Sequence, residues 1–295
     1  MCWQDYRVMK SIAETIDHLE KYQGKARVVA GGTDLMVQYR EGGWNGKVTL
    51  LDISSVPEIK GVKEEDGWIS VGGATTMREL AESVILRSQG RSLSMGALRV
   101  GSPQIRNVAT IAGNVVNAQP GADTSIPLIA LGAEAKIVSS RGEKWVLVEN
   151  LFQDIGRSTV DPSSEVVTHF RFRPAGKRGS SSVQRLARRR AFTLPSLVVA
   201  VALELNDDLR SFGNVRMAAG PVARTPWRAK EAEEILIGSP ASEPIISRAA
   251  SLAKAKAQPR SSLRGGAEYR KEMVEILMKR AFEECLKPFG GMVKE

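Results

Sequence analysis

Two short glycine-bearing segments contain the residue types in this chain that are best suited to hold a ligand. Residues 30–35 read Ala-Gly-Gly-Thr-Asp-Leu, and residues 109–114 read Ala-Thr-Ile-Ala-Gly-Asn. The first follows a β-branched run at 26–29 and opens a helical stretch at 35–39. This order directs backbone N–H groups and the positive end of a helix dipole at one spot, which suits a phosphate. Because the second segment has similar small residues about eighty positions later, the two could clamp one diphosphate.

The few cysteines and histidines exclude several kinds of site. The chain has two cysteines, Cys2 and Cys285, and two histidines, His18 and His169. An iron–sulfur cluster normally takes four cysteines and a structural zinc ion four Cys or His ligands, so neither can be assembled. We expect Cys285 to be a buried thiol on an amphipathic helix and His18 to lie on a helix surface. The sequence therefore predicts no metal ligand and no catalytic residue on this chain.

The composition is that of a globular protein with a sizeable core. The 295 residues leave room for two domains, and 42% of them are hydrophobic and 25% charged. No apolar run reaches the roughly 18 residues that a membrane helix needs. The N-terminus lacks a basic patch followed by an apolar core, so no secretion signal is expected. We expect no membrane span and a cytoplasmic location.

The net charge of +9 is concentrated in one segment, residues 171–190, which contains eight Lys and Arg and no acidic residue. Three interpretations stay open: a solvated hinge, a nucleic-acid patch, or a surface for an acidic ligand or subunit. Nucleic-acid surfaces usually interleave aromatic residues for stacking, and here these lie only at the borders. The pattern favours a linker that docks a partner or anchors an anionic cofactor, with no nucleic acid.

The elements that position the first segment form a βαβ-like opening. Residues 11–22 have helical periodicity with Ser11 as N-cap, and residues 48–53 form a second buried strand, parallel to 26–29. The dinucleotide-binding Rossmann alternative fails, because residues 31–34 lack the G-x-G-x-x-G spacing. Its ribose-binding acidic residue would also have to be Asp52, inside a buried run.

The rest of the chain divides into two parts near 175–182. Before this boundary we expect two hairpins, at 59–71 and 135–148, a strand at 165–173, and short helices at 77–83, 93–100 and 128–131. After it we expect three antiparallel strands at 182–186, 196–205 and 214–219, followed by helices at 226–237, 244–255 and 267–286. The second part contains no identifiable catalytic residue and is interpreted as a packing or docking unit.

Residues 100–114 and 30–34 together resemble the FAD-binding medium subunit of molybdenum hydroxylases, a family that includes the flavin subunits of bacterial xanthine dehydrogenase and carbon monoxide dehydrogenase. Residues 117–123 and 216–232 are also similar to that family. Residues 258–264 with Tyr269-Arg270 look closest to the xanthine dehydrogenase branch. The resemblance covers nearly the whole chain.

The resemblance implies an α+β protein. Its first part, 1–176, would be a two-subdomain FAD-binding fold of the vanillyl-alcohol-oxidase (PCMH) type, with subdomains at about 1–57 and 58–176. Its second part, 182–290, would be a small α+β domain of the carbon monoxide dehydrogenase flavoprotein type, with a three-stranded antiparallel sheet and three helices.

The resemblance also implies which residues contact FAD. The first wall of the pyrophosphate site would be Arg27, Val28, Val29, Ala30, Gly31, Gly32, Thr33, Asp34 and Leu35. The second wall would be Thr110, Ile111, Ala112, Gly113 and Asn114. The other implied contacts are Val100 beside the flavin, Asp123 on a polar part of the flavin or ribityl chain, Val167 as an apolar wall and Arg185 as a basic group.

Two positions depart from the family pattern. Ala112 replaces a glycine of the second segment, and alanine would be strained by roughly 1 kcal/mol or more if this position required a positive φ. We expect it to be tolerated. Val100 stands where some relatives have an aromatic residue over the flavin, so ring stacking is expected to be absent on that side.

The implied activity is electron transfer within a complex. A molybdenum-cofactor large subunit would oxidise the substrate, a small subunit with 2Fe-2S clusters would pass electrons to FAD on this chain, and NAD or another acceptor would receive them. A purine or N-heterocyclic substrate is implied by the C-terminal resemblance. The alternatives are a stand-alone FAD-dependent oxidase and a non-catalytic nucleotide-binding module. Oxidases of this fold often attach flavin through His or Cys, and neither residue lies in the glycine-bearing segments.

Overall fold

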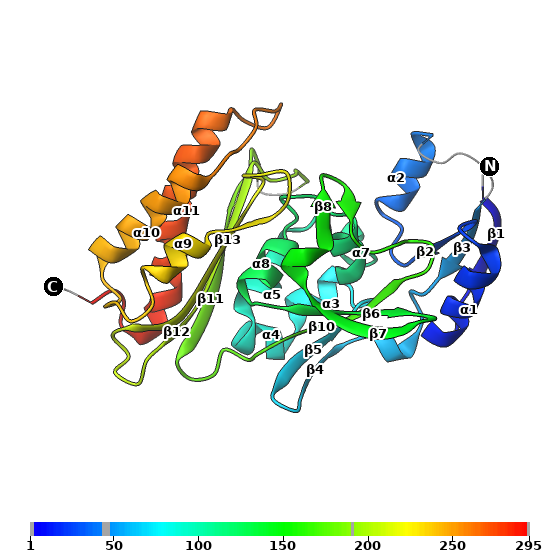
Figure 1. The fold of residues 1–295 in the computed structure, drawn as a ribbon, viewed down its shortest axis with the longest axis horizontal. Helices are drawn as coiled ribbons and strands as arrows, with labels where there is room; N and C mark the ends of the chain where they lie inside the picture. The colour runs from blue at the N-terminus through cyan, green and yellow to red at the C-terminus, as the bar shows by residue number, and fades with distance from the viewer. Residues whose placement is uncertain (1–2, 43–47, 190–191, 294–295) are drawn as a thin grey trace.

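The three larger sheets of the described residues follow one another along the long axis of the protein (Figure 1). The computed structural model describes residues 3–42, 48–189 and 192–293. The N-terminal sheet lies at one end, a five-stranded sheet in the middle, and a four-stranded sheet with the C-terminal helices at the other end. Helices of the central part separate the second sheet from the third. No helix in these three described ranges is both long and apolar enough to cross a membrane.

The N-terminal sheet is parallel, in the order β1 (Trp3–Val8), β3 (Val48–Asp52), β2 (Ala26–Val29). Helix α1 (Ile12–Tyr22) begins at Ser11, whose hydroxyl accepts the Glu14 N–H at 3.1 Å, and α2 (Leu35–Arg40) follows the first glycine-bearing segment. The predicted helix at 11–22 and the parallel pairing of the two buried strands are confirmed. Strand β1 was not predicted, because most of its residues are exposed and its sequence has no run of apolar residues.

The central sheet is antiparallel, in the order β4-β5-β10-β6-β7. Its strands are Val62–Glu65, Trp68–Gly72, Val166–Phe172, Glu134–Ser139 and Gly142–Leu147. Both predicted hairpins are present, and Phe170 and Phe172 on β10 are fully buried against the helical layer. The helices that cover this sheet are α3 (Met77–Glu82), α4 (Val84–Gln89), α5 (Arg91–Arg99), α6 (Pro103–Arg106), α7 (Ile111–Val116) and α8 (Ser125–Ala130). Shorter elements are η1 (Pro57–Ile59), η2 (Val148–Leu151), β8 (Phe152–Asp154) and β9 (Arg157–Ser158).

The C-terminal sheet is antiparallel, in the order β11-β12-β13-β14. Its strands are Gly179–Leu186, Leu197–Leu205, Phe212–Gly220 and Trp227–Arg228, and the elements after it are α9 (Lys230–Glu234), α10 (Glu243–Lys256), α11 (Ala267–Leu286) and η3 (Lys287–Phe289). Helix α11 matches its predicted bounds. Its Cys285 is fully buried, as expected, and burial raises the pKa of this thiol.

The expected three-stranded C-terminal sheet is wrong by one strand, because β14 pairs with β13 where the helix at 226–237 was predicted to begin. The cause is a buried carboxylate. Glu233 accepts the Met217 backbone N–H at 2.8 Å and pairs with the Arg228 guanidinium at 2.8 Å. These contacts hold the chain extended through Arg228, so α9 begins only at Lys230.

The central part and the C-terminal sheet share one core. Val183, Val198 and Ala218 of the C-terminal sheet belong to the same buried cluster as Phe170. The backbones approach so closely that a Cβ on Gly220 would lie 1.7 Å from the Pro120 carbonyl oxygen. Only glycine fits there, so at this point the backbones of the two parts meet without an intervening side chain.

We predict that Gly220→Ala is strongly destabilising, because the added methyl must push Pro120 and the sheet apart. The expected loss is about 1–3 kcal/mol in the free energy of unfolding, measured by urea denaturation. Gly213→Ala is the matched control on the same strand. Its Cβ would approach the Asn206 side-chain oxygen at 2.8 Å, which can move aside, and would come no nearer than 3.4 Å to the backbone. Equal stability of the two variants would contradict the tight packing described above.

Candidate cofactor site

The two glycine-bearing segments touch each other. A Cβ on Gly31 would lie 2.1 Å from the Val108 carbonyl oxygen and 2.8 Å from the Ala109 Cα. The backbone of the first segment therefore rests directly on the residues that lead into the second. This contact needs glycine at position 31, because any side chain there would force the N-terminal sheet away from the helical layer.

The first segment leaves backbone donors available. Gly32 has φ +65°, the left-handed conformation that glycine adopts most easily. The Gly32 carbonyl accepts the Met36 N–H at 2.9 Å, and the Asp34 carbonyl accepts N–H groups of α2. Within the described part of the chain, none of the four N–H groups from Gly31 to Asp34 donates to a protein acceptor. Four neighbouring unpaired donors form a cradle suited to an anion.

The second segment contributes in another way, because the N–H groups of residues 111–114 are already paired. The N–H groups of Ile111 and Ala112 donate to the carbonyls of Thr75 and Gly73, both at 3.0 Å. Thr110 caps α7, and its hydroxyl accepts the Gly113 N–H at 3.3 Å. This segment therefore forms a fixed wall.

Alanine is tolerated at position 112. Ala112 lies inside α7, and it is not among the described non-glycine residues with positive φ. Its neighbour is Gly73, where a Cβ would lie 3.2 Å from the Ala112 methyl and 2.7 Å from the Val167 carbonyl oxygen. The predicted tolerance is confirmed, because the space is provided by a glycine on the facing segment. The same contact places Val167, which is 4% exposed, beside the second segment.

Asp123 and Arg185 form an ion pair between the central helices and the C-terminal sheet. The Arg185 Nε lies 2.7 Å from the Asp123 carboxylate, and each side chain is only 10% exposed. Arg185 also donates to the Thr193 carbonyl at 2.5 Å. Burial raises the pKa of Asp123, while the positive charge and hydrogen bond of Arg185 oppose that rise.

Hydrogen bonds link this pair to the second segment and to Val100. Next to Asp123, the Thr124 hydroxyl donates to the Asn114 side-chain oxygen at 2.5 Å. On the other side, Arg185 contacts Thr193, and Phe192 directly precedes Thr193. The Phe192 N–H donates at 3.4 Å to the carbonyl of Gly101, which follows Val100. The second segment, Val100, Asp123, Val167 and Arg185 thus belong to one connected region. They come from the end of α5, from α7, from the segment before α8, and from β10 and β11.

The predicted side chains around the first segment differ in how deeply they are buried. Val29 is buried, whereas Val28, Ala30 and Leu35 are half-buried. The Arg27 guanidinium donates to its own neighbouring carbonyls, Gly24 at 3.0 Å and Ala26 at 2.8 Å, and so packs along its own strand.

Asn117 is a residue of this region that the sequence-based selection missed. Its side-chain oxygen accepts from Gln38 of α2 at 3.2 Å, and its side chain is also hydrogen-bonded to Asp34. Desolvation raises the pKa of Asp34, and the bond with Asn117 opposes that rise. Asn117 therefore links the two walls. The sequence could have indicated Asn117, because it lies in residues 117–123, which resemble the family.

The basic segment 171–190 does not form one surface. Arg171 pairs with Glu134 at 2.7 Å and lies over the rings of Trp68 and Trp145, whereas Arg185 is buried against Asp123. Arg178 pairs with Asp207. The segment runs along two different sheets, which disperses its charges, and Arg190 lies outside the described residues.

We predict that Arg185→Met lowers the free energy of unfolding by about 3 kcal/mol at pH 7, because the Asp123 carboxylate would stay buried without its partner. Its pKa would then lie further above the unfolded value, so protonation relieves the defect. The deficit should therefore shrink as the pH is lowered from 7 to 5. Urea unfolding at both pH values measures this, with Arg141→Met on an exposed turn as control. A pH-independent deficit would contradict the assignment.

Comparison with known proteins identifies the family. Residues 4–173 match the FAD binding domain in molybdopterin dehydrogenase, and residues 183–285 match the CO dehydrogenase flavoprotein C-terminal domain. The chain is 28% identical over 292 residues to a putative xanthine dehydrogenase FAD-binding subunit of Escherichia coli, covering 98% of each. It is 29% identical over 281 residues to the carbon monoxide dehydrogenase medium chain of Afipia carboxidovorans, covering 95% of this chain and 96% of that one.

The fold agrees as well. A chain of carbon monoxide dehydrogenase from Hydrogenophaga pseudoflava superposes with a TM-score of 0.90 at 25% identity, covering 98% of both chains. The first match spans more than half of this sequence and includes both glycine-bearing segments. The chain belongs to the family of FAD-binding medium subunits of molybdenum hydroxylases, and it is an FAD-dependent oxidoreductase subunit.

Proposed function

We propose that this chain carries electrons inside a molybdenum hydroxylase complex. In this proposal FAD on this chain receives electrons from 2Fe-2S centres of a small subunit and passes them to NAD or another acceptor. A large subunit with the molybdenum cofactor would oxidise a purine or another N-heterocycle. The support for this substrate class is the similarity to xanthine dehydrogenase subunits. The predicted domain bounds and the cytoplasmic location are part of the same proposal.

The observation that carries the proposal is the contact between Gly31 and residues 108–109 beside four unpaired N–H groups. These N–H groups, from Gly31 to Asp34, would hold the pyrophosphate. Thr110 and α7 would close the other side. Such a site accepts two negative charges without using a lysine or arginine, because backbone dipoles supply the positive potential.

Further residues would orient the rest of the cofactor. Val100 and Val167 would exclude water from the flavin, and the Asp123–Arg185 pair would present polar atoms at the boundary with the C-terminal sheet. Bound FAD supplies the exchange between single-electron and two-electron chemistry, whereas this chain supplies position and electrostatics. We assign no general acid or base to this chain.

The first test is flavin content. We expect the purified protein to show the near-ultraviolet and blue absorbance bands of flavin, with FAD released by acid. Gly31→Val should lower the affinity for FAD by about tenfold or more, equivalent to roughly 1.4 kcal/mol, because its side chain would meet Val108. Gly266→Val, where a Cβ meets nothing within 4 Å, is the matched control.

Folding must be followed in the same samples. We expect Gly31→Val to keep the circular dichroism and the protease resistance of the C-terminal domain. Full flavin occupancy in that variant, or a colourless wild-type protein, would refute the proposed site.

The second test concerns the electron relay. The isolated chain should not bleach its flavin when mixed with xanthine, whereas the complex with both partner subunits should do so and reduce NAD. Oxidation of a small substrate by the isolated chain would instead support the stand-alone oxidase. If other N-heterocycles bleach the flavin of the complex and xanthine does not, the electron relay stands and only xanthine is wrong as the substrate.

A further inference from the structure

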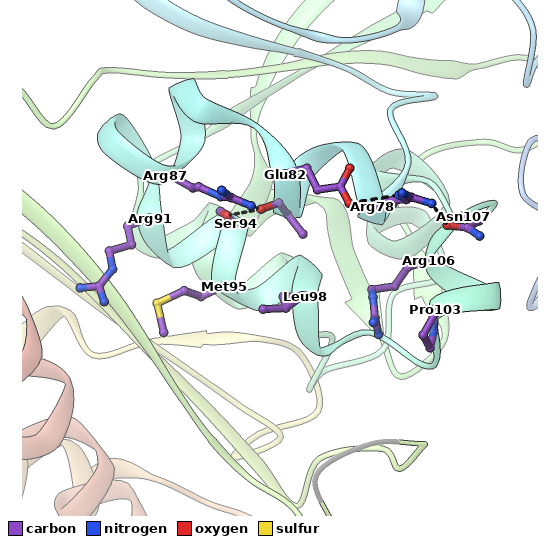
Figure 2. Close-up of a pocket in the computed structure, with 11 residues that line it drawn as sticks. Arg78, Glu82, Arg87, Arg91, Ser94, Met95, Leu98, Pro103, Arg106 and Asn107 are labelled. Atoms are coloured by element: carbon purple, nitrogen blue, oxygen red, sulfur yellow. Dashed lines mark hydrogen bonds and ion pairs between the residues drawn. The ribbon is translucent and has the colours of Figure 1, made fainter.

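A basic pocket lies outside the site described above, between the short helices α3, α4, α5 and α6 (Figure 2). Its volume is about 780 Å³. Arg87 and Arg91 stand at one end, Arg78 and Arg106 at the other (Figure 2). Arg106 belongs to residues 100–114, but the cofactor site gives it no role. The pocket therefore contains a part of the family motif that FAD binding leaves unexplained.

The pocket has a net positive charge that the protein neutralises only in part. Four arginines and one acid, Glu82, line it, which gives a formal charge of +3. Arg78 pairs with Glu82 at 3.1 Å, and Arg91 pairs with Glu284 at 2.9 Å.

The other two arginines have no carboxylate partner within the described ranges. Arg87 donates to the Ala81 carbonyl at 3.1 Å, and Arg106 donates to the Val100 carbonyl at 3.0 Å. Each guanidinium has five N–H donors, so most of theirs stay available. The two bonds hold the arginines at opposite ends of the pocket, ready for two separate acidic groups.

The space between the two ends is apolar. Met95 and Leu98 lie between the arginine pairs (Figure 2), and Leu98 is 53% exposed. An exposed apolar centre with an arginine rim is the composition of a protein interface, where Arg and Met are enriched. A small inorganic anion would leave this centre in water, so the pattern favours a protein surface with carboxylates on either side of an apolar group.

The pocket adjoins the region where the flavin is proposed to lie. The Arg106 bond to Val100 ties its edge to a predicted flavin contact. Helix α6 is followed within a few residues by Thr110 of the second wall. A partner seated on the pocket would therefore stand close to the flavin, and electron transfer requires such proximity.

From these contacts we infer that the pocket is the docking surface for the electron-donating iron–sulfur subunit, whose acidic face binds Arg87 and Arg106 around the apolar centre. This inference rests on the proposed function and names the surface that the donor uses.

The test is binding of the purified iron–sulfur subunit of the same complex to this chain. Arg87→Glu combined with Arg106→Glu should weaken binding at least about tenfold and slow flavin reduction, since like charges would then face each other. The milder pair Arg87→Gln and Arg106→Gln should have a smaller effect in the same direction. Raising the salt concentration should weaken binding of the wild type more than that of either double variant.

The control is Arg141→Glu, an equal charge reversal on the exposed turn between β6 and β7, which should bind like the wild type. Flavin absorbance of each variant reports separately on the cofactor site. A colourless wild type would refute the proposed function whatever the arginine variants do. Unchanged subunit binding in flavin-loaded double variants would overturn the docking surface. A second result would also overturn it. If the wild type binds pyrophosphate and the double variant loses that binding but still binds the subunit, the pocket is a site for small anions.

Discussion

The contact of the Gly31 backbone with Val108 and Ala109 joins the parts of this protein that are far apart in sequence. It brings a βαβ unit at the N-terminus against the loop that begins α7. Two consequences follow from this close backbone contact. The first segment must be free of a side chain at its centre, and its N–H groups remain exposed beside a capped helix. Because no side chain has room at Gly31, the binding site is formed by backbone N–H groups.

The same principle governs the junction with the C-terminal sheet. The Gly220 backbone faces the Pro120 carbonyl, and Gly121 packs against the ring and backbone of Pro221, so a glycine is needed on each side of the junction. The buried Asp123–Arg185 pair lies in this junction. Such a pair contributes less to stability than to a unique geometry, because desolvation offsets much of its attraction.

Charge is distributed according to the neighbours of each arginine. Arg185 is neutralised and buried, and Arg171 is sandwiched between two tryptophans beside Glu134, so neither is free for a partner. Arg87 and Arg106 come from segments without notable charge density, yet they face solvent without a carboxylate partner in the described structure. The concentration of positive charge in the sequence at 171–190 is therefore a poor guide to the surface.

Local patterns determined much of this protein from sequence alone. Ser11 caps α1 as its side chain predicts, and the hairpins and α11 follow from hydrophobic periodicity. The two glycine-bearing segments could be recognised as a pair before any contact was known. Only the tertiary structure decided what lies beyond the reach of local pattern: the exposed strand β1, the pairing that delays α9, the place of Gly73 opposite Ala112, and the arginine pocket. These depend on which distant backbones and charges meet, and that is set by packing across the whole chain.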